Sequence, residues 1–151
     1  MEYHFKIHKE KNGCWAECLE LPGCRSQADS LEELKGSAKE ALNLYLSEDL
    51  ESKVIFSMPK TNVGKNILAV EVDPGVALAL LVRQARLNRN MTQTQMKEAL
   101  GIKTLSNYQR LEDPKRANPE LRTLITIIKA LPEIKFGALL ESYKPSKKKA
   151  G

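Results

Sequence analysis

The sequence is poor in the residues that build disulfide frameworks, metal centres and membrane spans. Its 151 residues include three cysteines, two histidines and one tryptophan. No apolar run approaches the roughly 18 residues that a membrane-spanning helix requires. The first residues, MEYHFKIHKE, are charged throughout and lack the apolar core of a signal peptide. With 42% hydrophobic and 28% charged residues the chain has the composition of a folded protein, which we expect to be cytoplasmic with no membrane association.

The cysteines argue for a reduced, metal-free protein. Cys14, Cys18 and Cys24 are odd in number, so they cannot all pair within one chain, and a cytosolic protein keeps such thiols reduced. The alternative is a zinc site that adds His4 and His8. However, the Cys-x3-Cys-x5-Cys spacing differs from that of standard zinc fingers and ribbons. We therefore expect neither a metal nor a cofactor.

Charged residues are distributed unevenly along the chain. Residues 1–57 carry seven Lys/Arg against eleven Asp/Glu, residues 58–82 carry two of each, and residues 83–151 carry fifteen against six. The three segments thus have net charges of −4, 0 and +9 within the formal net charge of +5. Such asymmetry indicates two modules with different partners, and the basic module is a candidate for binding nucleic acid.

The first half has the pattern of a small sheet with one helix. Alternating apolar and polar residues predict a strand over residues 3–8, and Asn12-Gly13 is a preferred hairpin turn before a second strand. Further strands are expected at residues 24–28 and 67–72. Between these two, Ser30 and Glu33 form a capping-box pattern at the start of an amphipathic helix. We expect a β-β-β-α-β domain of the α+β class over residues 1–73.

The second half reads as helices only. Asp73-Pro74 is a helix-start signal, and further helices are predicted near residues 92–100, 104–112 and 118–131. Gly101 lies between two of them, as in a helix-turn-helix. The helix over residues 118–131 is expected to bury Leu121, Leu124, Ile125, Ile128 and Leu131, and a short final helix is expected at residues 134–143. We assign residues 74–143 to this all-α domain and expect the basic tail, residues 144–151, to be disordered.

Residues 76–131 resemble the phage-repressor-like (XRE/Cro) DNA-binding family. The matching features are Met91-Thr92-Gln93, Gly101 in the turn, and Leu111-Glu112 at the end of the recognition helix. There are two departures: Lys97 replaces a small alanine between the helices, and the run from Gly101 to Glu112 is one residue longer. The resemblance implies that the recognition helix enters the major groove with its N-terminal side chains toward the bases.

The alignment with that family assigns roles to particular residues. Arg110 suits guanine and Asn107 suits adenine, Leu105 also faces the groove, and Gln93 lies where the family holds a phosphate. Tyr108 and Leu111 are expected in the core, and Glu112 is expected to pair with a nearby basic residue. The predicted DNA-binding residues are Gln93, Lys103, Thr104, Ser106, Asn107, Gln109, Arg110, Lys115 and Arg116.

The first half resembles the HicB antitoxin family. The residues that carry this resemblance are Trp15 to Cys24, with the turn Leu21-Pro22-Gly23, followed by residues 29–34 and 38–42. Residues 108–114 also look like the C-terminal module of that family. The resemblance implies a sheet domain like part of an RNase H fold, which neutralises a small basic RNase, the HicA toxin. The predicted toxin-binding residues are Trp15, Glu17, Glu20, Glu32, Glu33 and Glu40.

These resemblances predict an antitoxin that occludes a HicA-like RNase and represses its own promoter by binding operator DNA as a homodimer or higher homo-oligomer. A free-standing XRE-family regulator with a sensing or dimerisation domain is the alternative. A third possibility, an RNase-H-like nuclease, requires carboxylates that converge on two metals. Glu17, Glu20, Glu40 and Asp73 are not held in one cluster by any motif, so we expect no enzyme.

Overall fold

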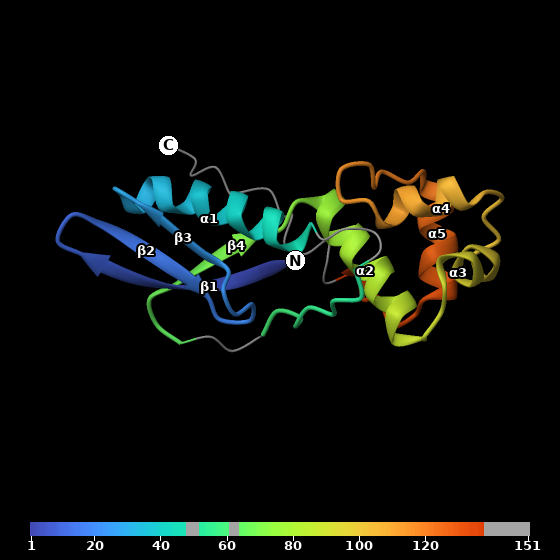
Figure 1. The fold of residues 1–151 in the computed structure, drawn as a ribbon, viewed down its shortest axis with the longest axis horizontal. Helices are drawn as coiled ribbons and strands as arrows, with labels where there is room; N and C mark the ends of the chain where they lie inside the picture. The colour runs from blue at the N-terminus through green and yellow to red at the C-terminus, as the bar shows by residue number, and fades with distance from the viewer. Residues whose placement is uncertain (48–51, 61–63, 138–151) are drawn as a thin grey trace, which may run out of the picture.

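The computed structural model describes residues 1–47, 52–60 and 64–137 (Figure 1). Its elements are β1 (Glu2–Glu10), β2 (Gly13–Cys18), β3 (Arg25–Ala28), α1 (Leu31–Leu46), β4 (Ile67–Glu71), α2 (Pro74–Asn88), α3 (Gln93–Ala99), α4 (Leu105–Glu112) and α5 (Leu121–Ala130). This order confirms the predicted α+β class and the β-β-β-α-β arrangement of the first half. The predicted tail, residues 144–151, and the segment before it, residues 138–143, lie outside the described residues. No helix in the described ranges combines the length and apolarity needed to cross a bilayer.

The four strands form one antiparallel sheet in the order β3-β2-β1-β4. The β1–β2 hairpin turns at Asn12-Gly13, as predicted, and Gly13 has a φ of 131° that side chains rarely adopt. A Cβ atom at Gly13 would also lie 2.9 Å from the carbonyl oxygen of Ala28. Glycine is therefore required there both by its backbone conformation and by the close approach of β3.

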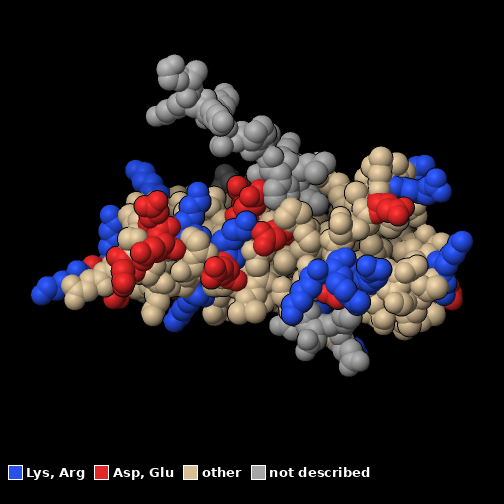
Figure 2. All heavy atoms as spheres, turned by 90° about the horizontal axis from the view of Figure 1, so that it is seen from above, with Lys and Arg blue, Asp and Glu red and all other residues tan. Residues whose placement is uncertain are grey.

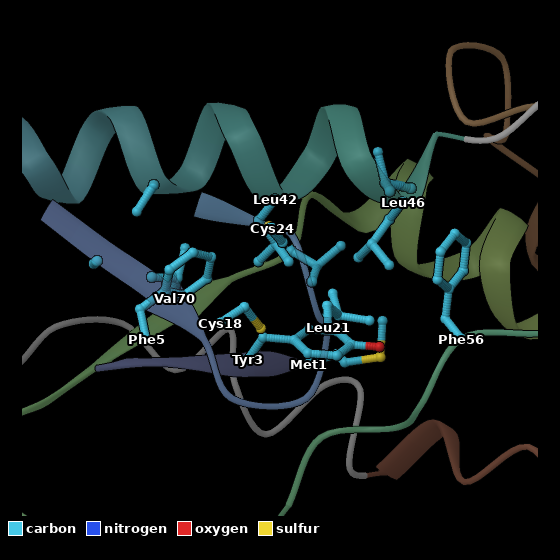
Figure 3. Packing of buried hydrophobic residues seen from close by; sticks show 14 of the residues in the cluster. Met1, Tyr3, Phe5, Cys18, Leu21, Cys24, Leu42, Leu46, Phe56 and Val70 are labelled. Atoms are coloured by element: carbon cyan, nitrogen blue, oxygen red, sulfur yellow. The ribbon is translucent and has the colours of Figure 1, made fainter. Parts of the chain in front are cut away.

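The first core lies between one face of the sheet and α1 (Figure 3). Alternate strand residues such as Tyr3 and Phe5 point inward, where they meet the apolar stripe of α1. That stripe consists of Leu34, Ala38, Leu42 and Leu46. Ser30 caps α1 by accepting a hydrogen bond from the Glu33 amide, as predicted. The opposite face of the sheet carries the strand residues that alternate with the buried ones, and no described helix covers it (Figure 1).

Helix α2 belongs to two cores at once. Val76, Ala77 and Leu80 are buried in the sheet core, whereas Leu78 and Val82 are buried in the helical core. The predicted domain boundary between residues 73 and 74 lies at the start of α2, where Asp73 occupies the N-cap position, although part of α2 packs in the sheet core. The Asp73 side chain makes no capping bond and instead lies 2.8 Å from the Lys39 ammonium. Helix α2 joins the two halves of the molecule because its residues are buried in both cores.

The expected burial of α5 was wrong at three of five positions. Leu131 is buried and Leu124 is half-buried, but Leu121, Ile125 and Ile128 are 73%, 44% and 46% exposed. The helix contacts the core through Ile127, which is fully buried. Leu121, Ile125 and Ile128 lie toward one edge of the apolar face of α5 and Leu124 and Ile127 toward the other edge, so the helical core covers only part of that face.

Glu20 is a buried carboxylate that ties together distant parts of the sheet domain. It accepts hydrogen bonds from the backbone amides of His4 and Lys60, both at 3.1 Å, and lies 2.7 Å from His4 Nδ1. Burial by itself raises the pKa of Glu20. The bonds from His4 and from the Lys60 amide outweigh that effect and hold this pKa below its usual value of 4.5.

These contacts predict an acid-sensitive contribution to stability. Since the pKa of Glu20 is lowered in the folded protein, the ionised carboxylate contributes fully to the free energy of unfolding above pH 4.5. This contribution is lost as the pH falls through the pKa of Glu20 in the folded state. We expect Glu20→Gln to lower the free energy of unfolding at neutral pH by about 1–3 kcal/mol. Urea unfolding at neutral and acidic pH measures this. Equal stability of variant and wild type at neutral pH would contradict the assignment.

Candidate nucleic-acid interface

The pair α3 and α4 forms a helix-turn-helix whose ends are fixed by local capping bonds. Thr92 and Gln95 make the predicted capping box at the start of α3. Gly101 takes a φ of 64° in the turn, which glycine adopts without strain. Thr104 then caps α4 by accepting a 3.2 Å hydrogen bond from the Asn107 amide. The Thr104 hydroxyl, a predicted DNA contact, is thus already engaged as a helix cap, although the residue is exposed.

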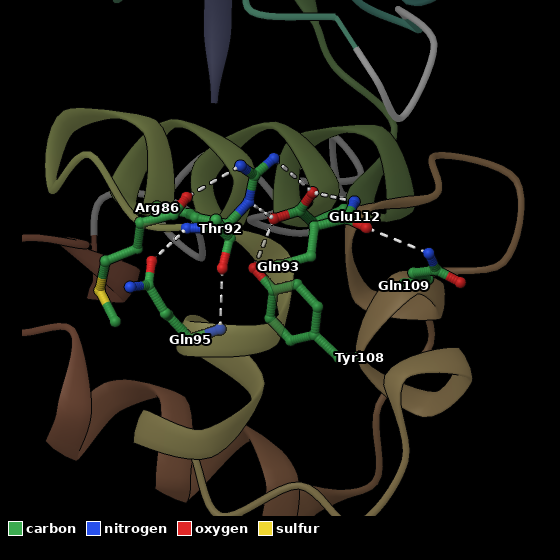
Figure 4. A network of polar contacts seen from close by, with 8 residues as sticks. Arg86, Thr92, Gln93, Gln95, Tyr108, Gln109 and Glu112 are labelled. Atoms are coloured by element: carbon green, nitrogen blue, oxygen red, sulfur yellow. Dashed lines mark hydrogen bonds and ion pairs between the residues drawn. The ribbon is translucent and has the colours of Figure 1, made fainter.

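A buried ion pair holds α4 against α2 (Figure 4). Glu112 accepts bonds from Arg86 Nε at 2.6 Å and from Arg86 Nη2 at 2.9 Å, and both side chains are buried. The Tyr108 hydroxyl donates to the same carboxylate. Arg86 also donates to the carbonyl of Met91, just before α3. The expectation that Glu112 pairs with a basic residue is confirmed, as is the burial of Tyr108 and Leu111.

The same carboxylate orients two predicted DNA-binding glutamines. Gln93 Nε2 donates to Glu112 at 3.1 Å, and Gln109 Nε2 donates to Gln93 Oε1 at 3.0 Å. The side-chain amides of Gln93, the first residue of α3, and of Gln109 on α4 are therefore fixed relative to each other (Figure 4). Because both side chains are half-buried and bonded, they are held in one geometry before any ligand binds.

The N-terminal part of α4 is exposed beside a basic concavity. Lys103, Leu105, Ser106, Asn107 and Arg110 are all exposed. A hollow of about 600 Å³ lies between α4 and α5. Its charged lining residues are Lys103, Arg110, Arg116, Arg122 and Glu120. With four positive charges and one negative charge, this surface is positively charged and so attracts the phosphates of nucleic acids.

Two residues of the concavity were not predicted from the sequence. Arg122 and Asn118 line it together with the predicted Arg110 and Arg116. The helix start at Asn118-Pro119 was recognised, but nothing in that pattern indicates that α5 begins beside the recognition helix. Lys115 and Arg116 are exposed in the turn after α4, and Arg116 lies 2.6 Å from Asp113. Part of the charge of Arg116 is therefore balanced within the turn.

The departure at Lys97 is accommodated without loss of the core. Met96 and Leu100 remain buried between the helices, while the Lys97 side chain is half-buried with its ammonium 3.9 Å from Glu98. The long aliphatic stem of a lysine can cover apolar surface while its charge stays in water. The α3–α4 packing thus tolerates lysine at the position where the XRE/Cro family usually has alanine.

The predicted toxin-binding residues do not form one surface. Trp15 and Glu17 lie on the open face of the sheet, whereas Glu32, Glu33 and Glu40 are exposed on α1, which covers the other face. Figure 2 looks onto α1 and shows Asp and Glu side chains gathered on the sheet half, with Lys and Arg side chains among them. Glu20 is buried, so its carboxylate is not available to a partner and its assignment to this set was wrong.

Trp15 forms the centre of a cluster on the open face of the sheet. Its ring stacks on His8 with centroids 4.0 Å apart, and the Arg25 guanidinium lies 5.9 Å from the ring centroid. Glu17 lies 3.2 Å from His8 Nε2 and 3.8 Å from Arg25. Tryptophan and arginine are enriched among the residues that dominate binding at protein interfaces. The cluster thus has the composition of a docking surface.

The residues considered for a metal site are the three cysteines together with His4 and His8. All three cysteines are free and buried, and burial raises the pKa of Cys18 to about 12 and that of Cys24 to about 11. Protonated, buried thiols are poor metal ligands. Across residues 1–47, 52–60 and 64–137, no three or more His, Cys, Asp or Glu side chains are placed to share an ion.

The carboxylates considered for nuclease chemistry lie apart. Glu20 is buried against His4, Asp73 pairs with Lys39, and Glu17 pairs with His8. Glu40 is exposed on α1. Since two-metal hydrolysis requires carboxylates that converge on one point, these four do not assemble such a centre.

Comparison with known proteins gives short but significant similarities. No family model matches the chain. The chain is 36% identical to a UPF0150 protein of Synechocystis over 59 residues. This match covers 39% of the chain and 81% of the relative. A UPF0150 protein of Archaeoglobus fulgidus is 43% identical over 47 residues, covering 30% of this chain and 68% of the relative. A UPF0150 protein of Helicobacter pylori is 43% identical over 56 residues, covering 37% of this chain and 76% of the relative.

Proposed function

The chain belongs to the UPF0150 protein family, and from this membership we propose that it is a HicB-like antitoxin. Its sheet half binds and occludes a small basic RNase of the HicA type. Its helical half binds operator DNA as a dimer and represses the protein's own promoter. The family includes HicB-like antitoxins, which supports the first part of the proposal. No catalytic role is proposed for the chain itself.

The DNA-binding role rests on one observation, the exposed start of α4 beside the basic concavity. The recognition helix of a helix-turn-helix presents its N-terminal side chains to base edges while basic residues around it contact phosphates. Here Asn107 and Arg110 are exposed on α4, and Lys103, Arg116 and Arg122 surround them. Gln93 and Gln109 are held beside them by Glu112.

The partner-binding role rests on charge and on the Trp15 cluster. Residues 1–57 have a net charge of −4, which complements a basic RNA-binding protein and speeds association with it. Trp15 is the only tryptophan of the chain, so its fluorescence reports directly on the open face of the sheet. Adding the purified partner should change this fluorescence and stop cleavage of labelled RNA at equimolar protein. Full cleavage in the presence of folded protein would contradict this role.

Arg110→Ala should weaken binding to the chain's own promoter DNA by about 1–3 kcal/mol, because a bidentate contact to guanine is lost. Arg110 is exposed on α4, so the fold should not change. The matched control is Lys135→Ala, which removes the same charge from an exposed site outside the concavity. Titration of labelled DNA measures both variants. If the two variants bind alike, Arg110 is not a base-reading residue.

A further inference from the structure

Helix α4 carries one large apolar side chain outside the helical core. Leu105, the first residue of α4, is 39% exposed, whereas Tyr108, Leu111 and Glu112 form the buried side of the helix. Within the described residues, those that form the helical core or pack against it do not include Leu105. Single exposed leucines are common on protein surfaces, so the significance of this one depends on where it lies.

Leu105 lies at the end of α4 that the proposed function directs toward the bases. In an α-helix the Cα–Cβ bonds tilt toward the N-terminus, so the side chain of the first residue points toward the start of the helix. Lys103, Asn107 and Arg110, which line the basic concavity, lie before and after Leu105 in the sequence and are exposed. Leu105 is therefore an apolar group within a polar and basic surface.

The start of α4 does not require a leucine at this position. Thr104 makes the N-cap bond by accepting from the Asn107 amide. A hydrophobic staple would join the residue before the cap, Lys103, to Tyr108, and so would not involve residue 105. Since neither capping nor the core uses the Leu105 side chain, the chemistry of the surface that it presents becomes informative.

A leucine can distinguish one base from the others through a single feature of the major groove. Guanine, adenine and cytosine present hydrogen-bond donors and acceptors there, whereas thymine also presents its C5 methyl group. A leucine packed on a donor or acceptor would deprive that group of water without replacing the hydrogen bond. Packed on the thymine methyl group, the same side chain buries apolar surface on both molecules.

We propose that Leu105 is a specificity-determining residue that reads the methyl group of a thymine in the operator. This rests on the proposed function, because it requires α4 to enter the major groove of DNA. Leu105 and Arg110 are separated by about 7.5 Å along the helix axis, so they contact different base pairs. The start of α4 thus selects thymine by packing, and Arg110 selects guanine by hydrogen bonding.

Replacing thymine by uracil tests this contact, because it removes the methyl group and leaves every hydrogen-bonding group in place. Each thymine of a labelled promoter duplex is replaced in turn, and each duplex is titrated with the full chain. At the thymine that Leu105 contacts, uracil should weaken wild-type binding about 4-fold, the effect expected for one buried methyl group. Wild-type affinity that is unchanged by uracil at every thymine would overturn the proposal.

Two variants assign the methyl contact to a residue. Leu105→Ala should bind the thymine duplex more weakly than the wild type and should not respond to uracil at that position. The matched control is Leu44→Ala, which changes another leucine, 79% exposed on α1, and should respond to uracil as the wild type does. Each protein is compared on two duplexes, so any change in its folded fraction cancels. A Leu105→Ala variant that responds to uracil like the wild type would overturn the proposal.

Leu105→Gln supplies a positive readout. Glutamine pairs with N6 and N7 of adenine, so this variant should prefer a duplex with adenine in place of that thymine, the reverse of the wild type. Retention of the thymine preference would overturn the role of Leu105. If the wild type binds promoter DNA but ignores the methyl groups, this inference alone fails. If it does not bind promoter DNA at all, the proposed DNA-binding function fails and the inference fails with it.

Discussion

Replacing Glu112 by alanine should destabilise the helical half by about 3–5 kcal/mol, because it leaves the Arg86 guanidinium buried without its counter-charge. Arg86 donates two hydrogen bonds to this carboxylate, and the pair is closed off from solvent. Tyr108 and Gln93 also lose their acceptor. Since a folded domain is stable by only about 5–15 kcal/mol, this is a large fraction of the total. Chemical unfolding followed by circular dichroism measures the loss.

The double variant Arg86→Met with Glu112→Leu is the matched control. Replacing a buried ion pair by apolar residues of similar volume is often close to neutral, whereas removing one partner is not. We expect the double variant to be more stable than Glu112→Ala. It should nevertheless bind promoter DNA more weakly than the wild type, because Gln93 and Gln109 are no longer held by the carboxylate. Equal stability of Glu112→Ala and wild type would contradict the role assigned to this pair.

Ending the chain after Asp73 should leave the sheet half largely unfolded. Val76, Ala77 and Leu80 of α2 are buried in the sheet core, and this truncation removes all three. Fully burying one large aliphatic side chain contributes about 1.5–3 kcal/mol, so a marginally stable domain cannot easily lose several. Gln84 also donates a 2.9 Å hydrogen bond to the carbonyl of Phe56, which ties α2 to the segment beside the sheet. Far-ultraviolet circular dichroism of the purified fragment measures the outcome.

A point variant separates the loss of core packing from the loss of chain length. Leu80→Ala in the full chain should cost about 2–5 kcal/mol through the cavity it leaves. Because α2 is shared, this change should shift the unfolding of both halves together. A fragment 1–73 that unfolds cooperatively at the same denaturant concentration as the full chain would show that α2 is dispensable for the sheet half.

Local signals in the sequence predicted most of the elements. Asn12-Gly13 predicted the hairpin, Ser30 predicted the start of α1, and Thr92 with Gln95 predicted the start of α3. These features act over three or four residues, so a single stretch of sequence carries all the information they need. The pairing of Glu112 with a basic residue was also expected, although the identity of Arg86 was not.

The features that were missed depend on distant parts of the chain. The burial of Glu20 follows from contacts with His4 and with Lys60, forty residues away along the sequence. The place of Arg122 in the concavity follows from the packing of α5 beside α4. The sharing of α2 between two cores arises because this helix is apolar on more than one side. Helix α5 has a single apolar face, and its periodicity does not say how much of that face the core covers, so the exposure of Leu121, Ile125 and Ile128 was missed.

The proposed function is tested most directly by expressing this chain together with any small basic protein that is encoded beside it. If the neighbour is the RNase, it should arrest growth when expressed alone, and the full chain should restore growth. Arg110→Ala should restore growth equally well, because Arg110 belongs to the proposed DNA-binding surface and not to the sheet half. Continued growth arrest in cells that contain the folded, soluble chain would contradict the proposal that it is an antitoxin.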